Sequence, residues 1–353
     1  MHEELKDYLL NQGKAPLDYV LDKFEKHEIV LLGEMHYIRQ QTELYHRLIP
    51  FLPEHGVNLI ATEFGRREDQ ALIDALLGKE QFDLPLAKLI LLRQDAFWGY
   101  REYLDIYRLI WEQNRRNPPD RQIRCIGLND PYNWKLYNKI CREQKRQPNA
   151  GEIKLIWQDC DEKNWLRALK SFHVPGVTKV LGIMGSHHAF TRYREPDFTR
   201  EGGHKVFAGF NKVRFGNHVH NEYGEAVCNV CFYDPWDSQE FDAPPQAPGG
   251  GIIGDIIGPR FSELAFDIKD SPAGELTDDS YYALGYEDFR LRDITDGMIY
   301  TCKFTEFKAL TAIPDFIDAD NLQEFRDFAP FNDMTDKSCE EINRAVAEWA
   351  DIW

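Results

Sequence analysis

The chain has 353 residues, of which 43% are hydrophobic, so it is long enough for one large domain with an ordinary buried core. Its 42 basic and 59 acidic residues give a formal net charge of -17, which disfavours nucleic acid and anionic membrane surfaces as partners. There is no stretch of about 18 uncharged apolar residues, and residues 1–13 lack the basic start and apolar run of a secretory signal, so we expect a cytoplasmic protein.

In chain order, short apolar runs rich in β-branched residues alternate with segments of helical period. This alternation predicts an α/β fold of three layers, α/β/α, with a mostly parallel sheet covered by helices on both faces. The predicted strands are residues 29–33, 58–64, 122–129, 179–184, 226–233 and 297–302. The predicted helices are residues 42–52, about 66–77, about 100–114 and 151–172.

The second half of the chain is less regular. We expect one domain over residues 1–353, with a long Pro/Gly-rich insertion or lid at about 236–279 and a helical C-terminal segment at about 319–353. The insertion contains a Gly-x-Gly-x-x-Gly pattern, but a Pro-rich loop precedes it where a dinucleotide site requires a strand. The aromatic residues in 349–353 suggest either a docking surface or packing on the same domain.

The seven cysteines are scattered, as expected of thiols in a reducing compartment. Cys228 and Cys231 form a Cys-x-x-Cys pair, but they lie in a predicted strand. Residues three apart on a strand point to opposite faces, so we expect buried structural thiols and no shared metal ion.

Polar side chains follow four of the predicted strands. In doubly wound sheets, ligands bind outside the carboxyl ends of the strands, where several loops meet. A single Glu or His at a strand end is more often a helix cap or a surface group, but the set together predicts a functional site. The four strand ends carry Gly33-Glu34-Met35-His36, Glu63 with Arg66 and Arg67, Asn129-Asp130, and Gly185-Ser186-His187-His188.

Two chemistries suit these side chains. Two His and one or two Glu can hold a divalent metal that acidifies a bound water. Alternatively, a His acts as general base on water, a Glu orients its ring and an Arg stabilises the oxyanion. The residues alone do not choose between them. We further expect Gly33 and Gly185, which lack a β-carbon, to let the chain turn sharply and direct the following His into the crevice.

Two other features give weaker indications. Ser186 is not in the Gly-x-Ser-x-Gly pattern of a nucleophilic serine. His218 and His220 would share a face only in an extended segment, whereas residues 209–225 resemble a turn followed by a short helix.

The motifs resemble those of a known superfamily, which joins erythromycin esterases, ChaN-like haem-binding proteins and Tiki-type metalloproteases. The resemblance spans roughly residues 28–305 and departs from the pattern at the Pro/Gly-rich insertion. It is carried by residues 31–36, 56–63, 126–130, 185–189, 216–232 and 295–301.

This resemblance implies a three-layer α/β fold and places Glu34, His36, Glu63 and His188 at functional positions. The Tiki branch uses such residues for metal-dependent peptide cleavage, and the esterase branch uses them to activate water, reportedly without metal. Met35 alone separates Glu34 from His36, a spacing closer to the ChaN and Tiki branches. ChaN is a lipoprotein, whereas this chain shows no lipid-attachment segment, so haem uptake at a membrane is the less favoured expectation.

Our main hypothesis is a hydrolase acting on an ester, amide or peptide bond of a small molecule or peptide. The expected catalytic residues, also the expected metal ligands, are Glu34, His36, Glu63 and His188; the metal would be Mn, Co, Fe or Zn. The expected substrate-binding residues are Tyr37, Arg66, Asn129, Asp130 and His187. The alternatives are a binding protein that holds haem through Tyr37 or a histidine, and a scaffold without catalysis.

Overall fold

The computed structural model describes residues 2–94, 96–157, 160–328, 334 and 336–350. The chain forms two compact units, each built from separated segments. Unit 1 comprises Met1–His36 and Lys179–Phe307, and unit 2 comprises Tyr37–Thr178 and Lys308–Trp353. The single-domain organisation expected from the sequence stays a prediction.

Unit 1 contains a mainly parallel sheet with the strand order β4-β1-β7-β9-β8. Only β8 runs antiparallel to its neighbour β9. The strands are β1 (Ile29–Glu34), β4 (Lys179–Gly185), β7 (Val227–Phe232), β8 (Leu264–Asp267) and β9 (Gly297–Tyr300). Because β1 pairs on both edges and is covered on both faces, all six of its residues are buried, which explains its continuous apolar sequence.

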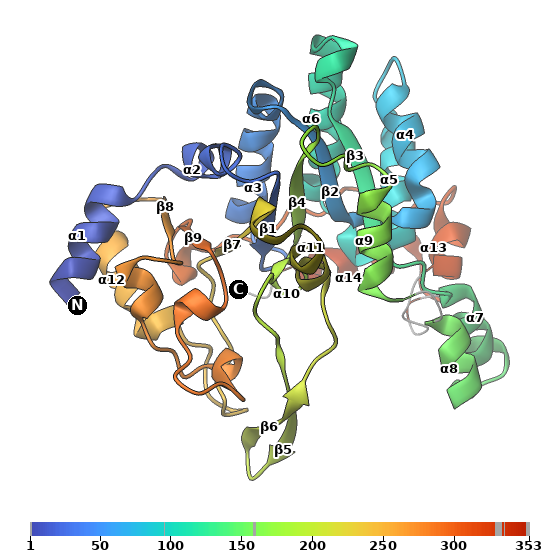
Figure 1. Ribbon diagram of the computed structural model, residues 1–353. Helices are drawn as coiled ribbons and strands as arrows, with labels where there is room; N and C mark the ends of the chain where they lie inside the picture. The colour runs from blue at the N-terminus through green and yellow to red at the C-terminus, as the bar shows by residue number, and fades with distance from the viewer. Residues whose placement is uncertain (1, 95, 158–159, 329–333, 335, 351–353) are drawn as a thin grey trace. The chain divides into compact units, whose positions relative to one another are not determined.

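Helices and a hairpin complete unit 1 (Figure 1). The helices are α1 (His2–Gln12), α2 (Pro16–Lys23), α10 (Ser186–Ala189), α11 (Phe215–Tyr223) and α12 (Ile252–Ile257), and the hairpin strands are β5 (Pro196–Glu201) and β6 (His204–Phe210). Helix α1 lies beside α12, far from it in sequence, and Leu5 and Leu9 join Ile253 and Ile257 in one core. This core lies at the β8–β9 side of the sheet.

Unit 2 contains the parallel strand pair β2 (Val57–Arg66) and β3 (Arg124–Asn129) with surrounding helices. These helices are α3 (Arg39–Leu48), α4 (Gln70–Gly78), α5 (Leu84–Gln94), α6 (Arg101–Arg116), α7 (Trp134–Asn138), α8 (Ala150–Ile156), α9 (Glu162–Lys170), α13 (Leu322–Phe328) and α14 (Cys339–Trp349). Helix α3 continues as a 3-10 helix to His55 and ends at Gly56, whose left-handed φ of 72° fits the cap expected there.

The predicted fold class is confirmed, because the strands are mostly parallel and helices flank them. Each of the six predicted strands has its counterpart in β1, β2, β3, β4, β7 or β9. The prediction of a helix from about residue 66 was wrong at its start, since β2 continues to Arg66 and α4 begins at Gln70. The helix predicted over residues 151–172 is two helices, α8 and α9, and residues 158–159 between them lie outside the described residues.

The segment expected as an insertion or lid contains α12 and β8, so part of it belongs to the unit 1 core. The expected C-terminal helical segment contains α13 and α14; of the suggested docking residues, Trp349 is exposed, and residues 351–353 lie outside the described part of the chain. The expected short helix over His218 and His220 is α11. Cys228 and Cys231 are buried, unpaired thiols of β7, as expected.

Gly33 has a role different from the one expected. Neither Gly33 nor Gly185 has a positive φ, and the left-handed residue of this stretch is Tyr37, with φ 72°. A β-carbon on Gly33 would lie 2.8 Å from Ser186 Cα, so Gly33 allows α10 to pack closely on β1. Its contribution is close packing and not a sharp turn.

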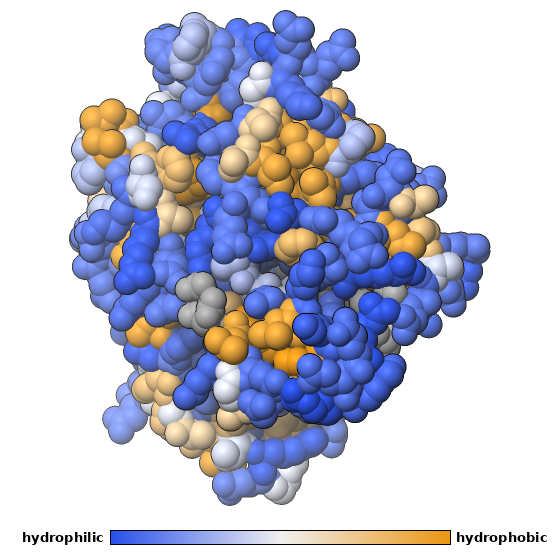
Figure 2. Space-filling view, turned by 90° about the vertical axis from the view of Figure 1, so that its right-hand side faces the viewer, coloured by the Kyte–Doolittle hydropathy of each residue, from blue (hydrophilic) through white to orange (hydrophobic). Residues whose placement is uncertain are grey.

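The surface in Figure 2 is largely hydrophilic, and its hydrophobic residues gather in separate small areas. Within the described ranges, no helix combines the length and hydrophobicity that a membrane crossing requires.

Candidate active site

The carboxyl ends of β1, β4 and β7 in unit 1 surround a cavity of about 350 Å³. These three strand ends deliver several of its polar side chains, as the position rule for parallel sheets predicts. The cavity is lined by Glu34, Met35, His36, Gly185, Ser186, His187, His188, Arg214, Asp234, Pro235, Trp236, Asp237, Tyr281 and Tyr282. The structure therefore brings together four residues singled out from the sequence, namely Glu34, His36, His187 and His188.

Glu34 and His36 form a hydrogen-bonded pair at the end of β1. Nδ1 of His36 lies 2.9 Å from Oε1 of Glu34. The Glu34 side chain is 1% exposed, whereas that of His36 is 31% exposed and lies at the cavity. Ser186 donates its hydroxyl proton to the main-chain oxygen of Glu34 at 3.1 Å, which joins α10 to the end of β1. A buried carboxylate next to Nδ1 favours the tautomer in which Nε2 is the basic nitrogen.

A second His–Glu pair lies at the same cavity. Nδ1 of His187 lies 3.1 Å from Oε1 of Glu195, and its Nε2 lies 3.0 Å from the Tyr282 hydroxyl. Burial lowers the pKa of His187, although the charge of Glu195 acts in the opposite direction. For Glu195, burial acts to raise the pKa, but the charge of His187 and the hydrogen bond from Arg214 outweigh it, and the pKa is lowered.

An aromatic wall closes one side of the cavity. Trp236 and Tyr282 meet at a ring-centroid distance of 5.0 Å, nearly perpendicular to each other, and Tyr281 adjoins Tyr282. Trp236 and Asp237 stand at the start of the segment expected as a lid, so that segment does contribute to the cavity. Such a wall offers apolar contact to a ligand, while the His and acidic side chains give it polar partners.

The other predicted site residues belong to unit 2. Glu63 is buried within β2, and Asn129 accepts a hydrogen bond from the main-chain N–H of Asp130 at 2.6 Å. Asp130 forms an ion pair with Arg67; burial raises its pKa, and Arg67 acts against that rise. Tyr37 stacks on Trp98 at 5.8 Å between ring centroids.

Arg66, expected to bind an anion, already has acidic partners in unit 2. Its Nη2 donates to Glu68 at 2.8 Å, and its Nε lies 3.8 Å from Asp69. The guanidinium also lies over the Phe328 ring, and burial lowers its pKa. An anionic ligand would therefore have to compete with Glu68 for this arginine.

A metal centre does not emerge from the described residues of the chain. Among them, no three His, Cys, Asp or Glu side chains are placed to hold one ion. Nδ1 of His36 and Nδ1 of His187 each face a carboxylate, which is also the partner that a metal-ligating histidine commonly has on its second ring nitrogen. The metal set expected from the sequence, with Glu63 in unit 2, stays a prediction.

Sequence reasoning missed several residues of this cavity. Asp234 lies two residues after the end of β7, and the rule used for the other strand ends would have found it. Arg214, Tyr281 and Tyr282, and Glu195 behind His187, follow no strand of the main sheet, and no motif marks them.

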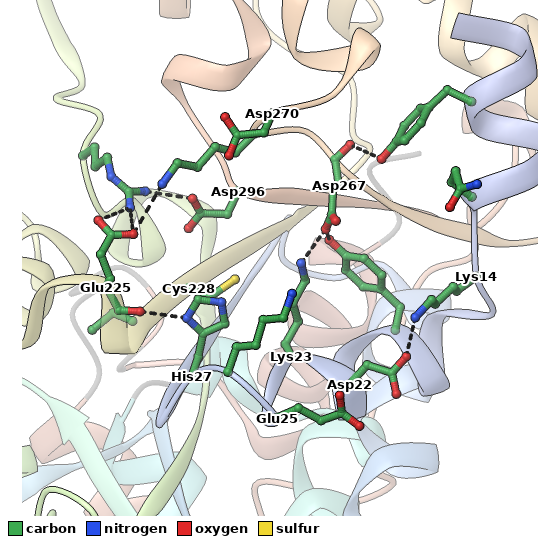
Figure 3. A pocket seen from close by; sticks show the side chains of 17 residues that line it. Lys14, Asp22, Lys23, Glu25, His27, Glu225, Cys228, Asp267, Asp270 and Asp296 are labelled. Atoms are coloured by element: carbon green, nitrogen blue, oxygen red, sulfur yellow. Dashed lines mark hydrogen bonds and ion pairs between the residues drawn. The ribbon is translucent and has the colours of Figure 1, made fainter.

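A larger cavity, of about 700 Å³, lies at the opposite, amino ends of β1 and β7. Figure 3 shows that several of its charged side chains form pairs. Lys23 pairs with Asp267, and Lys14 lies 2.6 Å from Asp22. Because these charges largely neutralise one another, the carboxyl-end cavity is the better candidate for an active site.

Comparison with known proteins identifies the fold. No family model matches the chain, and no curated protein matches it in sequence. A solved succinoglycan biosynthesis protein matches with a TM-score of 0.55 and 10% identity over 89% of this chain and 99% of its own. A Bacillus cereus protein matches with a TM-score of 0.54, 11% identity and the same two shares.

A mutant of the erythromycin esterase EreC, in its open conformation, also matches. Its TM-score is 0.49 with 13% identity, over 84% of this chain and 96% of its own. At these identities the likeness to the solved structures concerns the fold alone.

Proposed function

We propose that this protein is a hydrolase that activates water with the Glu34–His36 pair and cleaves a small ester or amide. The observation that carries the proposal is the 2.9 Å contact between His36 Nδ1 and the buried Glu34 carboxylate, beside a cavity. The carboxylate orients the ring and stabilises the imidazolium that forms when Nε2 takes a proton.

The reaction needs one base and one proton donor. Nε2 of His36 removes a proton from a water molecule, and the resulting hydroxide adds to the acyl carbon. The tetrahedral intermediate then collapses, the bond to the leaving oxygen or nitrogen breaks, and the leaving group takes the proton back from Nε2 of His36. The products are an acid and an alcohol or amine, and one water is consumed.

The size and lining of the cavity limit the substrate. About 350 Å³ is near the lower end of the range for small-molecule sites, so a compact acyl group fits better than a folded peptide segment. Trp236 and Tyr282 supply an apolar wall for such a group, and Arg214 and Asp234 supply polar partners. We therefore favour small esters and amides over peptides.

The test uses chromogenic short-chain esters and amides with the wild type, His36→Ala and Glu34→Gln. General-base catalysis contributes roughly 10²–10⁴-fold, so His36→Ala should lower kcat/KM by at least about 100-fold. His204→Ala is the matched control, since this exposed histidine lies in the β5–β6 hairpin and should leave turnover unchanged. Undiminished turnover in His36→Ala would refute the proposal.

The same samples test the two alternatives that the superfamily resemblance raised. Elemental analysis would detect a bound divalent metal, and loss of that metal in His36→Ala with His188→Ala would favour the metal-dependent form of hydrolysis. A haem absorption band together with no hydrolysis would replace the enzyme proposal by a binding function.

A further inference from the structure

We infer that Glu195 is a positioning residue that fixes the ring of His187, so that its Nε2 accepts a hydrogen bond from the Tyr282 hydroxyl inside the cavity. This inference rests on the proposed function and adds a second imidazole to its chemistry. Nothing in the sequence motifs pointed to Glu195, which lies eight residues beyond His187, just before the β5–β6 hairpin.

Glu195 is held by donors on every side. Arg214 Nη2 donates to its Oε2 at 2.9 Å, and the Tyr281 hydroxyl donates to its Oε1 at 2.8 Å. The side chain is 5% exposed, and these hydrogen-bond donors offset the cost of burying its charged carboxylate. Its remaining direction at Oε1 faces Nδ1 of His187, 3.1 Å away.

The position of Glu195 is fixed by the backbone as well. Its main-chain oxygen accepts a hydrogen bond from the N–H of Asn211 at 2.8 Å, which closes the base of the hairpin. Arg214 stands at the N-terminus of α11, where Asn217 caps its main-chain N–H at 2.9 Å. The carboxylate is therefore held between the base of the β5–β6 hairpin and the N-terminus of α11. A residue that orients another side chain needs such a fixed position.

This arrangement sets the tautomer of His187. Because both donors and the surrounding charges keep Glu195 an acceptor, Nδ1 of His187 carries the proton, and Nε2 is the basic nitrogen. Nε2 lies 3.0 Å from the Tyr282 hydroxyl, and Tyr282 lines the cavity. The ring is also stacked on Phe190 at 5.9 Å between centroids, so rotation away from Tyr282 is hindered.

Replacing Glu195 by Gln makes a sharp test. The amide NH₂ cannot face the Arg214 guanidinium, since both are donors, so the amide oxygen should turn to Arg214 and the NH₂ to His187. Nδ1 would then become an acceptor, and the neutral ring would switch to the Nε2–H tautomer. Shortening the side chain, in Glu195→Asp, keeps an acceptor and should preserve the Nδ1–H tautomer in part.

The measurement is the ¹⁵N chemical-shift pattern of His187 in the full-length protein, at a pH where the ring is neutral. We expect the Nδ1–H pattern in the wild type and in Glu201→Gln, an exposed acid on the same hairpin that serves as the charge-matched control. We expect the Nε2–H pattern in Glu195→Gln. A wild-type protein with the Nε2–H pattern would overturn the inference even if the Gln variant does not fold.

Turnover of the chromogenic substrate gives the second readout. Glu195→Gln should lower kcat by at least about 10-fold with little change in KM, because orientation of a proton-handling group acts on the chemical step. If His36→Ala is inactive while Glu195→Gln keeps wild-type turnover, this inference fails and the proposed function stands. If no hydrolysis is found in the wild type, the proposed function fails, whereas the tautomer pattern still decides the role of Glu195.

Discussion

Replacing Gly33 by alanine should destabilise unit 1 and displace the helix that carries His187 and His188. The new β-carbon would lie 2.8 Å from Ser186 Cα, 3.1 Å from Ala189 Cβ and 3.3 Å from Cys231 Sγ. The nearest of these atoms belongs to the backbone, which cannot rotate away as a side chain does, so α10 has to shift. Overpacking of a fitted core typically costs about 1–3 kcal/mol, and we expect the free energy of unfolding to fall by that amount.

Gly78→Ala provides the matched comparison. Gly78 is the last residue of α4, and nothing lies within 4 Å of a β-carbon placed there. The same methyl group should therefore leave the free energy of unfolding unchanged or raise it by up to about 1 kcal/mol, because alanine lowers the conformational entropy of the unfolded chain. Urea unfolding monitored by circular dichroism measures both variants, and esterase assays measure the effect on the site. A Gly33→Ala variant as stable and active as the wild type would refute the close-packing role of Gly33.

Three further results follow from the structure. Burial acts to raise the pKa of Asp267, but the hydrogen bond and charge of Lys23 lower it below 3.8. This ion pair therefore stabilises the fold above about pH 4, and its contribution is lost as the pH falls further. Acid unfolding curves should show a smaller loss of stability in Lys23→Met than in the wild type, and equal losses would contradict the pairing. Burial raises the pKa of the fully buried Cys125 thiol, so a thiol reagent should label it only in denaturant. Rapid labelling of Cys125 in the native protein would be inconsistent with its burial. The buried Tyr107 hydroxyl donates to the Phe64 carbonyl at 2.8 Å. Tyr107→Phe should therefore lower the free energy of unfolding, measured by urea titration, by about 1–3 kcal/mol. An unchanged urea midpoint would show that water replaces the bond.

The central strands were predictable because their burial on two faces imposes an apolar sequence. Strand β1 is buried along its whole length, and its run from Ile29 is unmistakable. The hairpin β5–β6 was missed because most of its residues are exposed, so no period of two in hydrophobicity marks it. Strand β8 was missed because it has only four residues and lies inside a segment rich in Pro, Gly and Asp.

The candidate site was partly predictable for a related reason. Glu34 and His36 follow a strand that the sequence identifies, and the strand-end rule then places them at a cavity. Glu195 and Tyr282 were not predictable, because Tyr282 is separated from His187 by 95 positions and Tyr281 from Glu195 by 86. Such contacts depend on the final path of irregular segments, which leave no periodic signal.

The interleaving of the two units bears on how the chain folds during synthesis. Strand β1 pairs through Ile29 with Val180 of β4 and Val227 of β7, so it stays without either neighbour until about 150 further residues have been made. At roughly 5–20 residues per second, this delay is on the order of 8–30 s, during which a strand of apolar residues is exposed at the ribosome. We therefore expect the nascent chain to depend on chaperones at this stage, and fragments that end before β4 to aggregate.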